Sequence, residues 1–407
     1  MRLRMSAALL AAGRQEEAAV ALDAFDAAAS PELAAGYDRL LQDMIKAGAF
    51  ETALVMLKNA GRCRGRRAAA EFRLAAACML VRRVPTAGLR GVLAGIDPSD
   101  LEKPEARCQL ATALTRVGLF EKALGLLSAL EASGEITGLH WFEKAIAHCC
   151  LWQLDQARAC LERDIESRGP LPFTRFWAAR FLFLQGRFAE AMRTVEAALE
   201  ARDAAGRTRS FLLMEAGNIS RSVGEFDRAV AFYEQAVACP GLASQPTAWM
   251  PAFEYACTLE FLGRREAAAR LARLGADLVA ENENASRVLS EYLAWRRAPS
   301  ARADVSGWAG AYERSFQPFL PYAAWAALMS AAVHEHEGRC EAAAGLVRAL
   351  ARDCAAFEPA ARAGLVSMLD VPGSWRRGEI LEAIGRALRP FHPQGGFDRE
   401  VFVRILS

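Results

Sequence analysis

Two short clusters in this 407-residue chain hold the side chains best suited to chemistry. His334, His336 and Cys340 offer nitrogen and sulfur atoms, and a zinc site needs three or four such ligands that converge. On a single helix only His336 and Cys340, four residues apart, would share a face. The second cluster, His148-Cys149, suggests a nucleophile beside a base, but adjacent helix residues point apart. We therefore expect neither a metal site nor a catalytic pair.

Other signatures of chemistry are missing from the sequence. It contains no phosphate-binding glycine loop, no dinucleotide fingerprint and no serine nucleophile elbow. The densest basic run is Arg62, Arg64, Arg66 and Arg67, and no aromatic residues interleave it for base stacking. The formal net charge is only +2, which gives no global field for nucleic acid. We expect no enzymatic activity, no cofactor and no nucleic-acid partner.

Composition indicates a protein with a large buried core. Hydrophobic residues make up 53% of the chain and charged residues 24%. The ten cysteines include no Cys-x-x-Cys pair, which is typical of apolar core residues in a reducing compartment. The N-terminal apolar stretch is short, and no stretch is long enough to span a membrane. Together with the enrichment in Ala, Arg and Gly, this predicts a cytoplasmic bacterial protein with no membrane partner.

The elements that carry these residues follow from a recurring turn signature. It reads Gly, any residue, an apolar or aromatic residue, two further residues, then Ala. Clear copies begin at Gly48, Gly118, Gly186 and Gly224. Weaker copies begin at Gly13, Arg82, Trp152, Gly263 and Gly338. A spacing of roughly 34 residues is typical of an array of helix–turn–helix units. The sequence therefore predicts an all-α fold.

Each position of the signature has a physical role. Glycine supplies the positive φ that ends a first helix, and the aromatic residue fills the space between two helices. The alanine lies where the helices cross, and a larger side chain would hold them apart. It recurs at Ala53, Ala87, Ala123, Ala157, Ala191, Ala229, Ala268 and Ala343. A second small position lies seven residues before the turn, at Ala75, Ala111, Ala145, Ala179, Gly217, Ala256 and Ala331.

This pattern resembles the tetratricopeptide repeat family. The best unit runs from Ser210 to Cys239 and carries Leu213, Ala216, Gly217, Ser220, Gly224, Phe226, Ala229, Tyr233 and Ala236, followed by Pro240. The resemblance implies a right-handed α-solenoid of about nine to ten helix hairpins. Residues 1–297 form the predicted array, and residues 298–407 a degenerate repeat followed by capping helices. The turns at Arg82 and Trp152 depart from the family by lacking glycine.

The C-terminal region leaves two alternatives open. Trp308, Tyr312 and Phe316 are four residues apart, so they form an aromatic stripe on one helical face. The stripe is either a buried second helix of a degenerate repeat, which we favour, or a binding face. The tail after Cys354 either covers the apolar end of the array or docks a second subunit.

The family resemblance also implies which residues face a groove. In the family the first helix of each hairpin lines the concave surface. Here the implied protein-binding residues are Arg116, Phe142, Phe176, Arg180, Phe183, Met214, Asn218, Arg221 and Phe253. Arginine forks suit carboxylates or backbone carbonyls, and aromatics anchor peptides. The alternative is that packing buries the aromatics and leaves the arginines paired with nearby acids.

These observations predict a non-catalytic scaffold that binds a protein or peptide in its groove. The alternative is an accessory subunit of an enzyme complex, which presents a substrate or docks the enzyme through residues 298–407. Under that alternative the partner is an enzyme in a hetero-complex.

Overall fold

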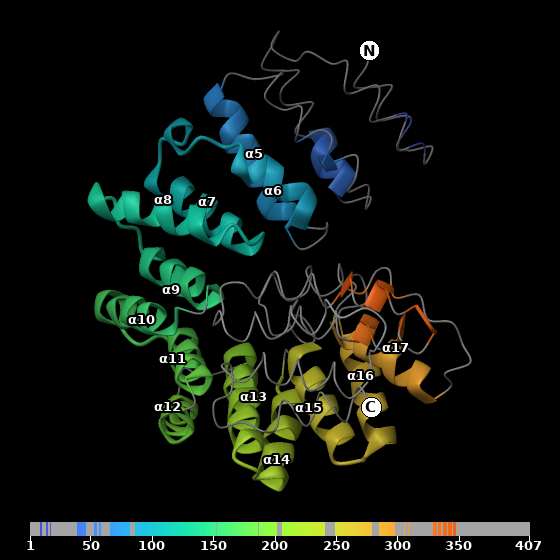
Figure 1. Cartoon of the computed structure of the whole chain (residues 1–407). Helices are drawn as coiled ribbons and strands as arrows, with labels where there is room; N and C mark the ends of the chain where they lie inside the picture. The colour runs from blue at the N-terminus through green and yellow to red at the C-terminus, as the bar shows by residue number, and fades with distance from the viewer. Residues whose placement is uncertain are drawn as a thin grey trace. The chain divides into compact units, whose positions relative to one another are not determined.

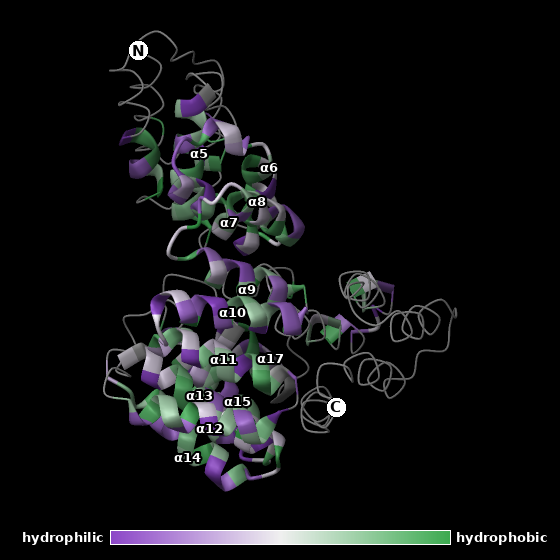
Figure 2. Ribbon diagram, turned by 90° about the vertical axis from the view of Figure 1, so that its left-hand side faces the viewer, coloured by the Kyte–Doolittle hydropathy of each residue, from purple (hydrophilic) through white to green (hydrophobic). Residues whose placement is uncertain are grey.

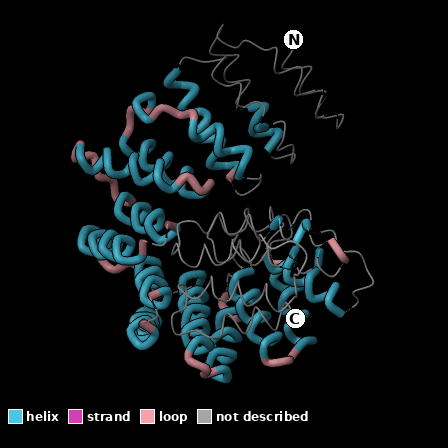
Figure 3. The backbone as a smooth tube through the Cα atoms, viewed as in Figure 1, coloured by secondary structure: helices cyan, strands magenta, loops and turns pink. Residues whose placement is uncertain are grey.

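The fold was analysed in a computed structural model of the chain. The structure describes residues 39–45, 66–81, 86–151, 153–185, 187–201, 206–240, 249–278 and 285–297, with single positions and short runs outside these ranges. Within them every regular element is a helix, and no strand occurs (Figure 3). The predicted all-α class is confirmed. The predicted handedness and the count of nine to ten hairpins extend over residues outside these ranges and stay predictions.

The chain divides into two compact units, Met1–Ala147 and His148–Ser407. The helices of the first unit are α5 (Arg66–Leu80), α6 (Thr86–Ala94), the 3-10 turn η2 (Pro98–Asp100), α7 (Pro104–Arg116), α8 (Phe120–Ala132) and most of α9 (His140–Cys150). In this unit α5 packs with α6 and α7, and α7 packs with α8 (Figure 1). The predicted boundary at residue 297 is a different division, and it stays a prediction because most of the chain beyond it lies outside the described residues.

The second unit repeats the hairpin arrangement. Its helices are α10 (Leu154–Arg168), α11 (Pro172–Leu184), α12 (Phe188–Glu200), α13 (Gly206–Ser222), α14 (Phe226–Val237), α15 (Trp249–Phe261), α16 (Arg265–Asp277) and α17 (Ala285–Arg297). Successive helices pack as hairpins, α11 with α12, α13 with α14 and α15 with α16. The second helix of each hairpin also packs on the first helix of the next, so the hairpins stack. The predicted helical array is confirmed for this region.

The turns use the chemistry that their sequence predicts. Gly118, Gly224 and Gly263 have φ values of 79°, 84° and 74°, a region that L side chains rarely adopt. The residue after each glycine donates its backbone N–H to a carbonyl five residues earlier, as Leu119 does to Leu114 at 2.9 Å. This pattern is the Schellman cap, which satisfies carbonyls at a helix end. The glycines therefore end the first helices where the signature places them.

The small positions of the signature are buried at the helix crossings. Each signature alanine in α8, α10, α12, α14 and α16 is 0% exposed, namely Ala123, Ala157, Ala191, Ala229 and Ala268. At the second small position, a Cβ on Gly217 of α13 would lie 2.6 Å from Cε1 of Tyr233 in α14. Only a residue without a side chain fits such an approach. The close helix packing therefore depends on these positions.

One member of the predicted small set is wrong. Ala75 in α5 is exposed, whereas Ala76 and Ala77 are 1% and 0% exposed. The turn that follows α5 begins at Arg82 and lacks glycine. At the other turn without glycine, which begins at Trp152, Ala145 of α9 holds the same position and is 0% exposed. The exposure of Ala75 is therefore a local departure of α5.

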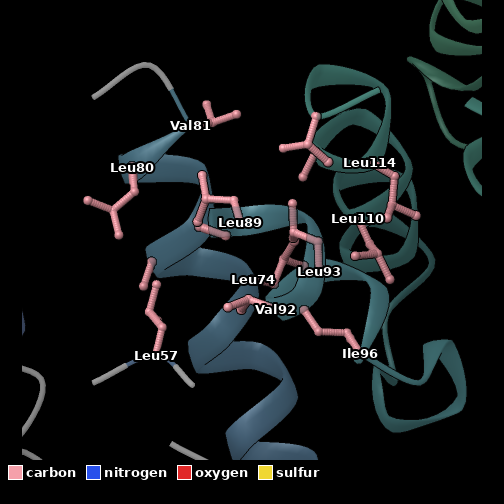
Figure 4. Packing of buried hydrophobic residues seen from close by; sticks show 14 of the residues in the cluster. Leu57, Leu74, Leu80, Val81, Leu89, Val92, Leu93, Ile96, Leu110 and Leu114 are labelled. Carbon is pink, nitrogen blue, oxygen red and sulfur yellow. The ribbon is translucent and has the colours of Figure 1, made fainter. Parts of the chain in front are cut away.

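The core of the first unit fills the space between α5, α6 and α7. Leu74 of α5, Leu89 and Leu93 of α6, and Leu110 and Leu114 of α7 point toward one another (Figure 4). All are at most 4% exposed, and burying one such side chain contributes roughly 1.5–3 kcal/mol. Hydrophobic and hydrophilic residues alternate along the helices (Figure 2). This core fixes the first helices α5 and α7, which carry part of the predicted binding face.

Candidate protein-binding face

The predicted groove residues separate into two groups by exposure. Arg116 of α7 and Phe142 of α9, both in the first unit, are half-buried. The other seven, all in the second unit, are at most 8% exposed. These seven are Phe176, Arg180, Phe183, Met214, Asn218, Arg221 and Phe253. In the second unit the predicted residues are therefore buried, and their role in binding stays a prediction.

The burial in the second unit extends over most of two first helices. Every described side chain of α13 from Ser210 to Arg221 is buried, and so is every one from Pro251 to Leu259 in α15. A helix that is buried all round belongs to the interior of a large protein. Met214 and Phe253, at 0% and 1% exposed, are core residues of these helices. Met214 and Phe253 therefore pack the helices of this unit together.

Arg180 of α11 pairs with Glu215 of α13. Its Nη1 atom donates to Oε2 of Glu215 at 2.7 Å, and the glutamate side chain is 0% exposed. Asn218 Nδ2 donates to the same oxygen at 3.2 Å, and the hydroxyl of Tyr233 donates to Asn218 Oδ1 at 2.7 Å. Burial raises the pKa of Glu215, and Arg180 counteracts part of that rise. The groups form one connected polar cluster inside the unit.

Arg221 repeats the arrangement one hairpin later. Its Nη1 atom donates to Oε2 of Glu254 in α15 at 3.0 Å and to Oγ1 of Thr258 at 3.2 Å. Its guanidinium carbon also lies 5.9 Å from the centre of the Tyr233 ring. Breaking such a buried pair is costly, because it leaves a buried charge without compensation. Arg180 and Arg221 therefore link successive first helices.

The acidic partners share a sequence position that the predicted groove did not include. Glu143, Glu215 and Glu254 each lie nine residues before the turn of their own hairpin. Each is buried, at 9%, 0% and 6% exposed. This recurrence of glutamate at a fixed distance before the turn is a feature of the sequence that could have indicated these pairs. The alternative that packing leaves the arginines paired with nearby acids is confirmed for Arg180 and Arg221.

The first unit keeps a more open face around Arg116. Arg116 acts electrostatically on Glu143 of α9 and on the thiol of Cys78 in α5, so it lies between these two helices. Burial raises the pKa of Glu143, while Arg116 and a hydrogen bond from Thr112 lower it. Among the residues that the structure describes, Arg116 forms no ion pair within 4.0 Å. Its guanidinium can therefore accept a further anionic contact.

Apolar side chains lie on the neighbouring first helices, at the positions that the family resemblance implies to face the groove. Met79 of α5 is 42% exposed, and other positions implied to face the groove are half-buried. These half-buried positions are Phe72 of α5, Thr112 of α7, and Phe142 and Ile146 of α9. We call Phe72, Met79, Thr112, Arg116, Phe142 and Ile146 the Arg116 face. It combines exposed apolar surface with one arginine, the composition of a protein-binding patch.

The residues considered for catalysis lie in settings unsuited to it. Cys149 is 1% exposed, and burial raises the pKa of its thiol to about 12. Such a thiol is protonated at neutral pH and is a poor nucleophile. Nδ1 of His148 lies 2.7 Å from Oε1 of Gln153. No group of three or more His, Cys, Asp or Glu side chains within the described ranges could hold a metal. His336 and Cys340 lie outside those ranges.

An open groove in the second unit escaped the sequence reasoning. It has a volume of about 590 Å³ and lies along α11 and α12. Its lining residues are Arg175, Leu182, Glu190, Arg193, Thr194, Ala197, Ala198 and Ala201. None of the predicted binding residues lines it. The groove is formed by the outer side of a hairpin, where the repeat signature sets no residue type.

The comparisons with known proteins concern the helical-repeat fold. No family model and no curated protein matches the sequence. A Rap protein complexed with competence and sporulation factor is 14% identical, with a TM-score of 0.49, and the match covers 79% of this chain and 98% of that chain. A tetratricopeptide repeat protein from Parabacteroides merdae is 16% identical, with a TM-score of 0.41 and coverages of 59% and 92%.

The stacked hairpins, their Schellman turns and the buried alanines at constant phase decide the fold type. The described hairpins resemble those of tetratricopeptide repeat proteins in fold. The chain's departures from that pattern are the turns without glycine and the burial of α13 from Ser210 to Arg221 and of α15 from Pro251 to Leu259. In the described part of the chain, no helix is long and apolar enough to cross a membrane.

Proposed function

We propose that this chain is a non-catalytic scaffold that binds a segment of a partner protein. The Arg116 face carries the proposal. Its apolar side chains are partly exposed on the first helices α5, α7 and α9; α5 packs on α7, and Arg116 of α7 acts electrostatically on Glu143 of α9. Exposed apolar residues in phase on neighbouring helices supply a continuous contact surface, which a single exposed residue does not. Arg116 and Phe142 are the two predicted binding residues that lie on this face.

Arg116 gives the proposed contact its polar specificity. A guanidinium presents a planar fork of donors that matches a carboxylate or two backbone carbonyls. Glu143 lies within electrostatic reach of Arg116, and the Arg116 side chain is half-buried, so part of it is open to solvent. We therefore expect the partner segment to place an acidic group or a carbonyl pair on Arg116 and apolar side chains on Met79 and Phe142.

The buried predicted residues have a supporting role in this proposal. Arg180 and Arg221 hold α11, α13 and α15 in register through their glutamates. Phe176, Phe183, Met214 and Phe253 pack between the same helices, and Asn218 completes the polar cluster. They would affect a partner only through the arrangement of the helices. The accessory-subunit alternative requires docking through residues 298–407. Most of these residues lie outside the described ranges, and we do not propose it.

A capture experiment with matched variants tests the proposal. Full-length chain is used as bait in extract of its native host, alongside Met79→Asp and Arg116→Glu. Leu274→Asp is the control, because Leu274 on α16 is also 42% exposed but lies in the other unit. Circular dichroism confirms that each bait is helical. The proposal expects a partner that Leu274→Asp retains and that both face variants recover at least about tenfold less. Equal recovery of every partner by all four baits would contradict it.

A further inference from the structure

His140 occupies a position that strongly disfavours a charged imidazole. It is the first residue of α9 and is 0% exposed. Neither Nδ1 nor Nε2 has a hydrogen-bond partner. Its ring instead meets the edge of Trp141, with centroids 5.0 Å apart and planes at 84°. A neutral ring tolerates this setting, whereas an imidazolium there would have two buried donors without acceptors.

The charges around the ring oppose protonation as well. Lys144, one turn later on α9, lowers the pKa of His140, and Glu131 of α8 acts in the opposite direction. Lys144 Nζ lies 2.5 Å from Oε2 of Glu131, so the pair partly cancels at the ring. Desolvation is the largest cause of the lowered pKa. The N-terminus of a helix, where His140 lies, carries partial positive charge and disfavours a further cation.

The loop before His140 is the part of the first unit that depends on this ring. Ser133–Leu139 joins α8 to α9 and carries Ile136 and Leu139, which are 46% and 52% exposed. Glu135 in this loop accepts from Nη1 of Arg107 at 2.7 Å, and the N–H of His140 donates to the carbonyl of Thr137 at 3.1 Å. The N–H groups of Gly134 and Glu135 also donate to the carbonyls of Glu131 and Leu130 in α8, so the start of the loop is tied to α8. The exposed residues Ile136 and Leu139, just before His140, form the part of the loop that a displaced ring would free.

We infer that His140 makes the start of α9 an acid-sensitive latch, in which the neutral ring holds the loop Ser133–Leu139 and a protonated ring releases it. Acid thus favours a locally opened state in which the ring reaches water. The opening also frees the first turn of α9, which carries Phe142. The latch acts within the first unit and does not depend on the proposed partner.

The sign and window of the effect follow from proton linkage. An exposed histidine titrates near 6.5, so the opened state binds a proton below that pH and the closed state does not. Closed-state stability is therefore complete above about pH 6.5 and falls as the pH drops toward the lowered pKa of the buried ring. Between pH 7.5 and 5.5 the opening constant is expected to rise up to about tenfold.

Hydrogen–deuterium exchange of the full chain measures this opening. Rates for peptides within 133–147, corrected for the intrinsic effect of pH, are compared at pH 7.5 and 5.5. Peptides from α8 serve as the internal reference. The wild type is expected to show roughly five- to tenfold more opening at pH 5.5. His140→Phe, which cannot titrate, is expected to stay within about twofold, and the control His148→Gln is expected to behave as the wild type.

Equal pH dependence of exchange in the wild type and His140→Phe would overturn the inference. If His140→Phe does not fold, an NMR titration of the imidazole C–H signals in the wild type decides instead. The latch requires His140 to titrate clearly below the ordinary value of about 6.5. Titration of His140 at that ordinary value would overturn it equally.

Discussion

Removing the arginine of the Arg180–Glu215 pair should destabilise the second unit strongly. In Arg180→Met the apolar side chain keeps most of the packing, but Glu215, at 0% exposed, loses its ion-pair partner. Breaking a buried pair in this way costs about 3–5 kcal/mol, because one charge stays buried without compensation. Asn218 donates one hydrogen bond to Glu215 and offsets only part of that cost. We expect a loss of about 3 kcal/mol or more at neutral pH.

The loss should depend on pH in a defined direction. Burial already raises the pKa of Glu215, and Arg180 is the main group that counteracts the rise. Without Arg180 the folded-state pKa rises further above its unfolded value. A raised carboxyl pKa means that the folded state binds the extra proton, so stability falls as the pH increases above about 4.3. The difference in the free energy of unfolding between wild type and Arg180→Met should therefore be smaller at pH 5 than at pH 8.

Urea unfolding followed by circular dichroism at both pH values measures this prediction. The double variant Arg180→Met/Glu215→Met is the matched control, because it removes both charges and should recover much of the stability. A repeat array can unfold in more than one step. Hydrogen exchange of the α11 and α13 amides therefore checks that the unfolding midpoint reports on these two helices. A loss below about 1 kcal/mol that is the same at pH 5 and pH 8 would refute the reasoning about the buried pair.

Further predictions concern the close helix contacts, measured by the same unfolding experiment. Ala157→Leu should destabilise by about 1–3 kcal/mol through overpacking, while Ala159→Leu on the exposed side of α10 should change little. Similar unfolding midpoints for these two variants would contradict a close helix crossing at Ala157. Gly217→Ala should destabilise, because its Cβ would lie 2.6 Å from the Tyr233 ring. By contrast, Gly125→Ala in α8, which has open space, should stabilise by about 0.5–1 kcal/mol. The opposite order of these two glycine variants would contradict the helix spacing.

Much of the fold was predictable because its determinants are local. A glycine with positive φ, an aromatic residue and a small residue at fixed spacing describe one hairpin, and the chain repeats them. Gly118 and Ala123 meet these expectations in the structure. The rule fails at Ala75 of α5, which is exposed although it holds the same position relative to its turn as the buried Ala111 and Ala145.

The candidate site was less predictable because exposure is set between hairpins. The family resemblance indicates which side of a first helix faces a groove, and it does not tell whether that side reaches solvent. Arg116 and Arg180 are both first-helix arginines with a glutamate one hairpin later, Glu143 and Glu215, yet one is half-buried and the other pairs inside the unit. The difference depends on how the helices pack around each arginine and not on the presence of the glutamate. His140 escaped the sequence reasoning for the same reason, since burial of a loop-end histidine has no local signature.

The most direct test of the proposed function maps where the partner touches the chain. Hydrogen–deuterium exchange is measured for the full chain alone and with the purified partner from the capture experiment. The account predicts slower exchange on binding in α5, α7 and α9, at peptides that contain Met79, Arg116 and Phe142, with α16 unchanged. Protection confined to α16, or to any surface outside those three helices, would contradict it.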